Sequence, residues 1–328
     1  MKLNRVFLAS MMALAGAAMG CPGPSTTDDA GMMMSGDDTG MTMGDDAGMM
    51  TAQPVVQTGT MAMPVAPDYD CRGSNTAPTP GAAVMANVRV SVLSLMSFPA
   101  ASAPIQIFPG SQIRAACDGD CIMTTTDSMG VANVSIEAGS WFGYRLPAGG
   151  TGMNTWVPSI GYFYTFPDAA DGTTTVTAIG TVAASLVANG LNRELTADSS
   201  AVSGSVTDCD GNNVANVAIR MFRGSSEICP GGCPADDTTM PRITGLSDAT
   251  IPARSPDGLT RFAGRFAGIL PAAGGPVRIE AYGSLTEGAA PVLLGCEEVL
   301  VEGNTVTIAV IPPLRNDYPA GHACMGRM

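Results

Sequence analysis

The cysteines and the lone histidine, His322, have the widest chemistry in this chain of 328 residues. Two cysteine pairs, Cys117 with Cys121 and Cys229 with Cys233, each have three residues between them. A thioredoxin-like redox site needs two intervening residues and an alternation of strands and helices that this sequence lacks, so redox catalysis is disfavoured. Loop-stapling disulfides are the favoured use of such pairs in an exported β domain.

A single histidine excludes most enzyme chemistry that depends on imidazole. It leaves no two-histidine zinc site, no pair of histidines as general acid and base, and no Ser/His/Asp triad away from residue 322. A hydrolase would have to use carboxylates alone, and no paired motif supports that chemistry. The acidic run from Asp208 to Asn212 lacks the order of a calcium loop and fits a hairpin turn better. We therefore predict no catalytic residue, no metal site and no cofactor.

The first 20 residues have the organisation of an export signal. Two basic residues precede an apolar run over 6–18, which is shorter than the about 20 residues of a membrane-spanning helix. Residues 18–21, Ala-Met-Gly-Cys, resemble a bacterial lipobox, in which cleavage before the cysteine leaves it lipid-modified. Because Ala18 stands where lipoboxes usually have leucine, ordinary secretory cleavage after Gly20 remains the alternative. We predict a lipid anchor on Cys21 in the cell envelope, and Pro22 favours the outer membrane, at its periplasmic face or at the cell surface.

The cysteine count favours a disulfide framework. The chain has nine cysteines, and lipid attachment to Cys21 leaves the even number expected of an exported protein. Eight cysteines allow about 105 connectivities, which the sequence does not distinguish. Our hypothesis is two local disulfides, Cys117 with Cys121 and Cys229 with Cys233. The other candidates would be joined over longer range: Cys71, Cys209, Cys296 and Cys324.

Charge and composition set residues 21–70 apart. The formal net charge of −13 becomes −15 when Lys2 and Arg5 are removed with the signal, which disfavours a nucleic-acid partner. Residues 21–70 are rich in Asp, Gly, Thr and Met and cannot bury enough apolar surface to fold, so we expect a disordered spacer. The alternative is copper or another soft metal, because thioethers select Cu(I) and nine methionines lie between Met32 and Met63. In that alternative the two cysteine pairs would also bind the metal.

From residue 71 onward, short β-branched runs are punctuated by Gly, Pro and Asp. Val84 to Val92 alternates apolar and polar residues, which predicts a strand with one apolar face. Further strands are expected over 105–108, 131–136, 141–146, 160–166, 202–206, 217–221, 265–270, 277–282, 292–296 and 305–311. We predict an all-β protein with one antiparallel β-sandwich over 71–180 and another over 201–328. The connecting segment over 181–200 would hold a short helix.

Aromatic residues gather in the first predicted sandwich. An exposed aromatic strip could bind sugar or a partner chain, although packing in the core is the more common fate of such residues. The candidate ligand contacts are Trp141, Tyr144, Trp156, Tyr162 and Tyr164.

A recurring order of strands and turns links the two predicted sandwiches. The first has Thr126-Asp127, Gly130, Val134, Ile136 and Gly139, and the second has Gly264-Arg265-Phe266, Leu270-Pro271, Gly274, Val277 and Ile279. This order resembles the carboxypeptidase regulatory-like domain, a transthyretin-like Greek-key β-sandwich. The first copy departs from it at residues 141–144, and the second has a long insertion over 224–258. The resemblance implies a bacterial lipoprotein with tandem domains of this kind.

Such a protein is expected to be a non-catalytic surface scaffold or binding module rather than an enzyme. Its partners would be the membrane, through the lipid anchor, and a glycan or an envelope protein.

Overall fold

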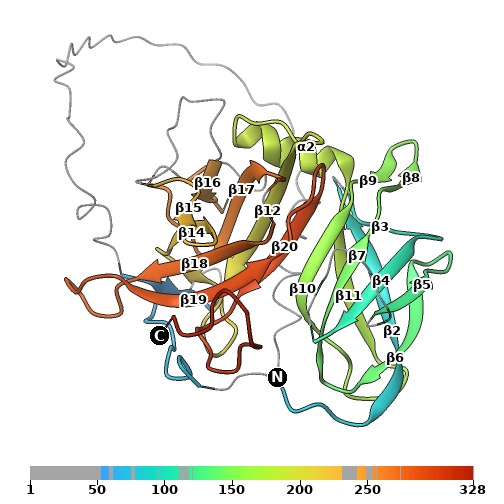
Figure 1. The fold of residues 1–328 in the computed structure, drawn as a ribbon, viewed down its shortest axis with the longest axis horizontal. Helices are drawn as coiled ribbons and strands as arrows, with labels where there is room; N and C mark the ends of the chain where they lie inside the picture. The colour runs from blue at the N-terminus through green and yellow to red at the C-terminus, as the bar shows by residue number, and fades with distance from the viewer. Residues whose placement is uncertain are drawn as a thin grey trace, which may run out of the picture.

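The computed structural model describes residues 53–58, 62–74, 78–94, 96–110, 113, 117, 119, 121–230, 242–248, 254–255, 257–273 and 275–327. The all-β class predicted from the sequence is confirmed: α2 (Thr181–Gly190) is the one helix among these residues, and the other elements are strands. The strands build two β-sandwich modules that lie side by side in Figure 1.

The first module contains strands β2 to β11. One layer has the order β11-β2-β3, with β6 also paired to β2, and the facing layer has the order β10-β7-β4-β5. Alternation builds the core: Val88, Val90 and Val92 of β2 are fully buried between the layers, whereas Arg89 points to solvent. The bounds are β2 (Ala83–Leu93), β3 (Phe98–Pro99), β4 (Pro104–Pro109), β5 (Ile122–Thr125), β6 (Val131–Glu137), β7 (Trp141–Leu146), β8 (Gly149–Thr151), β9 (Asn154–Trp156), β10 (Ser159–Thr165) and β11 (Thr173–Ile179).

The second module contains β1 and strands β12 to β20. Its layers have the orders β16-β17-β12-β20 and β15-β14-β18-β19, and β1 pairs with β13 at the side. The first and last long strands of each module pair in parallel: β2 with β11, and β12 with β20. The other pairings between named strands of one module are antiparallel. The bounds are β1 (Val55–Val56), β12 (Ser199–Val206), β13 (Val214–Ala215), β14 (Ala218–Arg223), β15 (Ser226–Glu227), β16 (Arg242–Gly245), β17 (Arg265–Pro271), β18 (Val277–Gly283), β19 (Val292–Val299) and β20 (Val306–Ile311).

A single sheet of eight strands runs through both modules. Strand β20 pairs in parallel with β12 on one side and with β10 of the first module on the other, where Ser159 lies opposite Val306 and Gly161 opposite Ile308. Backbone hydrogen bonds therefore join the modules directly. The two modules are therefore joined by sheet pairing as well as by side-chain packing.

Strand β10 serves both cores because it carries a β-bulge. Its pairing with β7 shifts register between Gly161 and Tyr164, and Phe163 inside the bulge has a φ of 60°. Ile160 and Tyr162 consequently point into the core of the second module, whereas Tyr164 points into the core of the first. A positive φ is unfavourable for a bulky residue, so the surroundings of Phe163 must hold it there.

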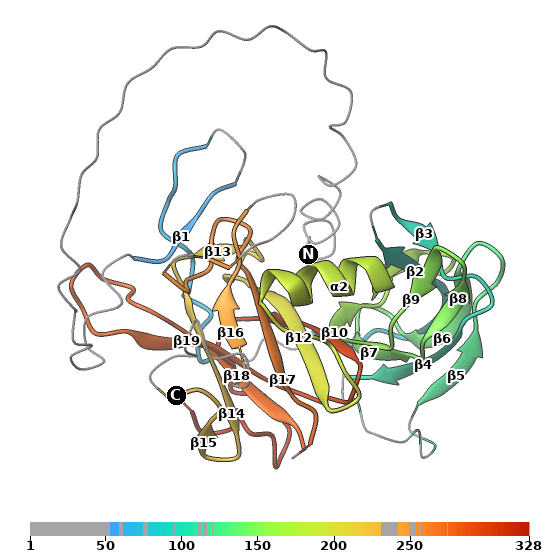
Figure 2. The ribbon, with the colours of Figure 1, turned by 90° about the horizontal axis from the view of Figure 1, so that it is seen from above.

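Helix α2 covers the outer face of the shared sheet. Figure 2 shows it lying across the strands near the junction of the modules. Ala184 and Ala188 pack with Ala201 of β12, Ile269 of β17 and Ile308 of β20, whose side chains point away from the sandwich core. The helix falls within the segment where the sequence favours one.

The start of the described chain corrects the predicted extent of the spacer over 21–70. Val55 and Val56 pair with β13, and Val56 and Tyr69 are buried in the core of the second module. Residue 71 is likewise bound to the second module rather than the first, through its disulfide to Cys209. The average composition over 21–70 does not reveal these few apolar residues. They pack into a core whose strands lie more than 100 residues further along the sequence.

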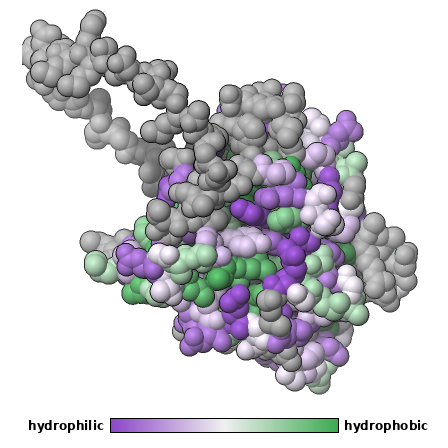
Figure 3. Space-filling view, turned by 60° about the vertical axis from the view of Figure 1, so that its left-hand side comes forward, coloured by the Kyte–Doolittle hydropathy of each residue, from purple (hydrophilic) through white to green (hydrophobic). Residues whose placement is uncertain are grey.

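The surface mixes polar and apolar residues, and hydrophobic ones form a band at the centre of the face in Figure 3. Most of the exposed large apolar side chains among the described residues are methionines: Met63, Met85, Met96, Met123, Met129, Met153 and Met325. Taken one by one, exposed apolar side chains such as these are normal on a protein surface.

Candidate functional site

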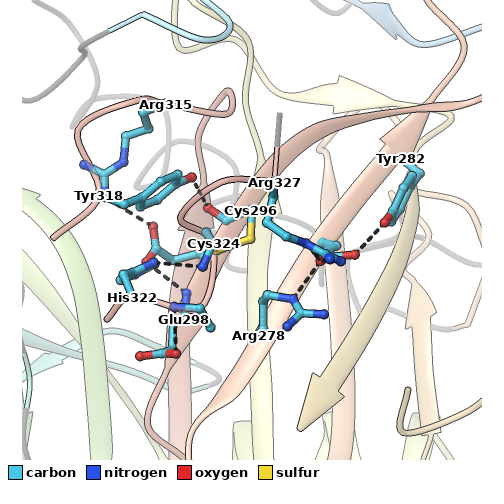
Figure 4. Close-up of a disulfide and its surroundings, with 12 residues drawn as sticks. Arg278, Tyr282, Cys296, Glu298, Arg315, Tyr318, His322, Cys324 and Arg327 are labelled. Atoms are coloured by element: carbon cyan, nitrogen blue, oxygen red, sulfur yellow. Dashed lines mark hydrogen bonds and ion pairs between the residues drawn. A yellow bond between two sulfur atoms is a disulfide. The ribbon is translucent and has the colours of Figure 1, made fainter. Parts of the chain in front are cut away.

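Residues 312–327, here called the C-terminal strap, lie against strand β19 without forming a helix or a long strand (Figure 4). The disulfide Cys296–Cys324 ties the strap to β19 with a Cα–Cα distance of 5.8 Å. Tyr318 donates its hydroxyl to the carbonyl of Cys296 at 2.7 Å, and Glu298 accepts the backbone N–H of Ala323 at 3.1 Å. The strap is therefore held by covalent, side-chain and backbone contacts at several points.

His322 is one of these points. Its Nδ1 accepts the backbone N–H of Cys324 at 3.2 Å, which leaves the ring proton on Nε2, facing the Oε1 of Glu297 at 3.0 Å. The ring also stacks on Tyr318, with centroids 4.7 Å apart and planes inclined by 15°. Both ring nitrogens are thus occupied, so His322 positions the strap and has no free nitrogen to act as a general base.

Arg315 joins the strap to the first module. Its guanidinium carbon lies 4.8 Å from the ring centre of Trp141, 5.2 Å from that of Phe163 and 4.6 Å from that of Tyr318. Trp141 belongs to β7 and Phe163 to the bulge of β10, so the cation is surrounded by rings from both sides of the junction. Trp141 also meets Phe163 edge to face at 5.3 Å, and these contacts hold Phe163 at its positive φ.

Glu297 is a buried carboxylate behind Arg315. Only 1% of its side chain is exposed, and its Oε1 accepts the N–H of Glu298 at 2.9 Å as well as the contact from His322. Its Oε2 has no hydrogen bond from any described residue and lies 3.8 Å from Nη2 of Arg315. A buried carboxylate oxygen without a donor is costly, which marks this wall as a place where a cationic group would be stabilised.

The strap, β19 and the first module enclose a cleft of about 530 Å³. The first module contributes Pro109 and Trp141, β19 contributes residues 297–299, and the strap contributes Arg315 and Ala320. This volume lies in the range of small-molecule binding sites. The cleft is the candidate functional site.

Tyrosines beside the cleft stay protonated. Burial raises the pKa of Tyr162 above its ordinary value, although the N–H of Leu300 that donates to its hydroxyl at 2.7 Å acts in the opposite direction. Burial likewise raises the pKa of Tyr318, with Glu297 adding to the effect. Neither phenol supplies a base near neutral pH.

A second polar cluster lies on β18, beneath the end of the strap. Glu280 is fully buried and accepts hydrogen bonds from Arg278 at 2.7 Å, from Arg327 at 3.0 Å and from the Tyr282 hydroxyl at 2.5 Å. Burial alone would raise the pKa of Glu280, but the hydroxyl and the two guanidinium groups outweigh it and hold the pKa below its usual range. Burial and the neighbouring carboxylate raise the pKa of Tyr282 to about 12. Because every member has a partner, this cluster anchors Arg327 and shows no open position for a ligand.

The structure corrects the predicted aromatic strip. Tyr144, Trp156 and Tyr164 are buried in the core of the first module, with exposed fractions of 0%, 6% and 9%. Only Trp141 and Tyr162 reach the cleft. Because the alternation of β7 and the bulge of β10 send neighbouring rings to different sides of the sheet, proximity in sequence does not make a continuous aromatic surface.

Disulfide bonding, which the cysteine count predicts, is present. The structure joins Cys71 to Cys209 and Cys117 to Cys121, with Cα–Cα distances of 5.8 and 5.5 Å, in addition to the strap disulfide. Cys229 is also disulfide-bonded, and its predicted partner, Cys233, lies outside the described residues.

Two sequence predictions concern residues whose structure is not described. These are the lipid attachment at Cys21 and the metal-binding alternative for the methionines from Met32 to Met63, of which only Met63 is described. In the described part of the chain, no group of three or more His, Cys, Asp or Glu side chains is placed to hold a metal ion. Asp208 there accepts the N–H groups of Asp210 and Asn212 at 3.1 and 2.8 Å, as in the expected turn. None of the described helices is both long and apolar enough to cross a membrane.

Comparisons with known proteins give a loose structural likeness. No protein-family model and no curated protein matches the chain. Among solved structures, the shaft pilin SpaA from Lactobacillus rhamnosus GG is 9% identical with a TM-score of 0.22, over 71% of this chain and 98% of that one. The minor pilin GBS52 of Streptococcus agalactiae is 11% identical with a TM-score of 0.18, over 72% of this chain and 98% of that one.

The Bacillus anthracis TIE protein is 11% identical with a TM-score of 0.21, over 70% of this chain. The match spans only 34% of the TIE protein. At these identities and TM-scores, no activity or partner transfers from the three proteins to this chain.

Sequence reasoning named His322 but missed Glu297, Arg315 and Tyr318 as its companions. Glu297 lies on a strand and Arg315 on the strap, and the cleft also needs Trp141 from the other module. No local motif connects these positions. The one sequence signal that could have pointed to the site is the concentration of charged and ring-bearing residues in the strap, after strand β20.

Proposed function

We propose that this protein is a non-catalytic binding protein of the cell envelope that holds its ligand in the cleft between its modules and the strap. The observation that carries the proposal is the construction of the cleft. Its walls come from two modules joined by one sheet and from a strap secured by a disulfide, so the site is preformed.

The chemistry of the lining supports binding rather than catalysis. The histidine has both nitrogens engaged, and the pKa values of the neighbouring tyrosines are raised by burial. A nucleophile activated by a general base, the usual arrangement in hydrolases, has no counterpart among the described residues of the cleft.

The finer parts of the proposal rest on the sequence. The export signal and the motif ending at Cys21 support a lipid anchor in the outer membrane. The modules would then stand on an acidic spacer at its periplasmic face or at the cell surface. The turn-and-strand order supports tandem transthyretin-like domains, and a glycan or an envelope protein is the proposed partner.

Two experiments test the proposal. Intact mass of the chain purified from membranes should show a diacylglyceryl or triacylglyceryl group on Cys21, and an unlipidated start would refute the anchor. Co-sedimentation with purified peptidoglycan and a glycan and peptide array should reveal binding that Ala320→Trp, which fills the cleft from the exposed strap, abolishes. Ala289→Trp, at an exposed loop position away from the cleft, is the matched control. Binding that is equal in both variants would refute the cleft as the site.

A further inference from the structure

The charges that line the cleft are mostly negative. Glu137 at the end of β6, Glu297 and Glu298 on β19, and Asp317 on the strap contribute carboxylates from three separate elements. Arg315 is the lining residue with a permanent positive charge, and it is only 5% exposed and enclosed by rings. The accessible part of the cleft therefore presents carboxylates to a ligand, and the chain's net charge of −13 attracts cations toward it.

An independent observation points to a missing donor. The Oε2 of Glu297 is buried without a hydrogen bond, and the nearest cation, Arg315, is 3.8 Å away, beyond hydrogen-bond distance. A buried acceptor normally has a partner. A ligand that brings a positively charged donor into this wall would satisfy it.

The occupied oxygens discriminate between kinds of cation. Oε1 of Glu297 already accepts two contacts, and Oε2 of Glu298 already accepts the N–H of Ala323. A guanidinium fork needs both oxygens of one carboxylate, whereas an ammonium donates single hydrogen bonds to separate carboxylates. Glu297 and Glu298 each keep one oxygen that accepts no hydrogen bond, so these two carboxylates favour an ammonium group over a guanidinium. An inorganic cation is disfavoured because the described carboxylates do not gather into a metal-binding group.

The apolar part of the lining favours an organic ligand. Pro80, Pro109, Pro276 and Trp141 also line the cleft, and their apolar surface suits an aliphatic stem that carries its charge at the tip. The volume of about 530 Å³ accommodates more than one side chain, so it suits a short peptide segment.

We propose that the cleft binds a peptide-borne primary amine, such as a lysine side chain of a partner protein, with the ammonium group between Glu297, Glu298 and Glu137. This inference rests on the proposed function and specifies its ligand class. The acidic spacer of this chain is excluded as the occupant by its charge, and the mature chain carries no lysine of its own to fill the cleft.

Isothermal titration calorimetry on the full mature chain tests the proposal with the peptide acetyl-Gly-Lys-Gly-amide. The norleucine analogue, which has the same stem without the charge, should bind at least about tenfold more weakly, because a charged hydrogen bond contributes more than about 1.4 kcal/mol. The arginine analogue should also bind more weakly than the lysine peptide. Glu137→Gln and Glu298→Gln should each weaken the lysine peptide by about tenfold.

Glu287→Gln is the matched control, because it removes one negative charge from an exposed loop that does not line the cleft. It should change binding less than about twofold, since exposed distant charges are screened. Equal binding of the lysine and norleucine peptides, or no effect of either cleft variant, would overturn the proposal. Stoichiometric displacement of the lysine peptide by Ca²⁺ would also overturn it in favour of a metal site.

Comparing glycan binding with lysine-peptide binding tests the ligand class separately from the proposed binding function. If peptidoglycan or a neutral glycan binds in a manner abolished by Ala320→Trp while the lysine peptide does not bind, the ligand class is wrong and the binding function stands. If neither binds, both are refuted.

Discussion

Replacing Arg315 by methionine should destabilise the junction between the strap and the first module. Arg315 is 5% exposed, contacts three aromatic rings, and pairs with Glu297 and Asp317 at 3.8 and 3.7 Å. Methionine keeps much of the apolar stem but leaves the buried Glu297 without its cation. Removing one partner of a buried ion pair costs about 3–5 kcal/mol. For a protein of this size each kcal/mol lowers the melting temperature by about 2–4 °C, so a decrease on the order of 10 °C is expected.

The measurement is thermal and urea unfolding of the oxidised protein, compared with Arg89→Met. Arg89 is exposed on β2, so its replacement should change stability by less than about 0.5 kcal/mol. The double variant Arg315→Met with Glu297→Gln should lose less stability than the sum of the two single variants, because the second change removes the unpaired charge. Equal melting of Arg315→Met and Arg89→Met, or strict additivity in the double variant, would refute the reasoning.

Three further outcomes follow from the structure. The raised pKa of Tyr282, about 12 in the folded state against about 10 unfolded, means that its contribution to stability is complete below pH 10 and is lost between about pH 10 and 12. Tyr282→Phe should remove the loss of unfolding free energy between about pH 10 and 12. An unchanged dependence of stability on pH would contradict the raised pKa of Tyr282. Breaking Cys71–Cys209, which closes a separation of 138 residues, should cost about 5 kcal/mol, against about 3.5 kcal/mol for Cys296–Cys324 with 28. Serine variants compared by urea unfolding test that order, and the reverse order would refute the loop-closure account. Gly161→Ala should cost about 1–3 kcal/mol, because a Cβ there overlaps the ring of Tyr144 across the strand pair; calorimetry showing wild-type stability would contradict this packing.

Much of the strand content is readable from the sequence. The alternation over 84–92 corresponds to β2, and the runs expected over 131–136, 277–282 and 305–311 correspond to β6, β18 and β20. These segments are rich in β-branched residues, and 131–136 and 277–282 end close to a glycine, so local signals suffice. Strand β11, with its run of threonines, was not predicted, because it is secured by parallel pairing to β2 rather than by an obvious apolar pattern.

The candidate site is mainly a product of tertiary structure. Sequence analysis named Trp141, Tyr162 and His322 but could not predict that Trp141 meets Arg315 or that Tyr162 turns toward the second module. The bulge at Phe163 and the parallel pairing of β10 with β20 decide both, and each depends on contacts between segments far apart in the chain. Local alternation and the turn residues determined the all-β class, and the cysteine content predicted disulfide bonding. The shared sheet, the strap and the cleft were decided only by long-range pairing, because backbone hydrogen bonds and buried charges find their partners by position in space and not by spacing in the sequence.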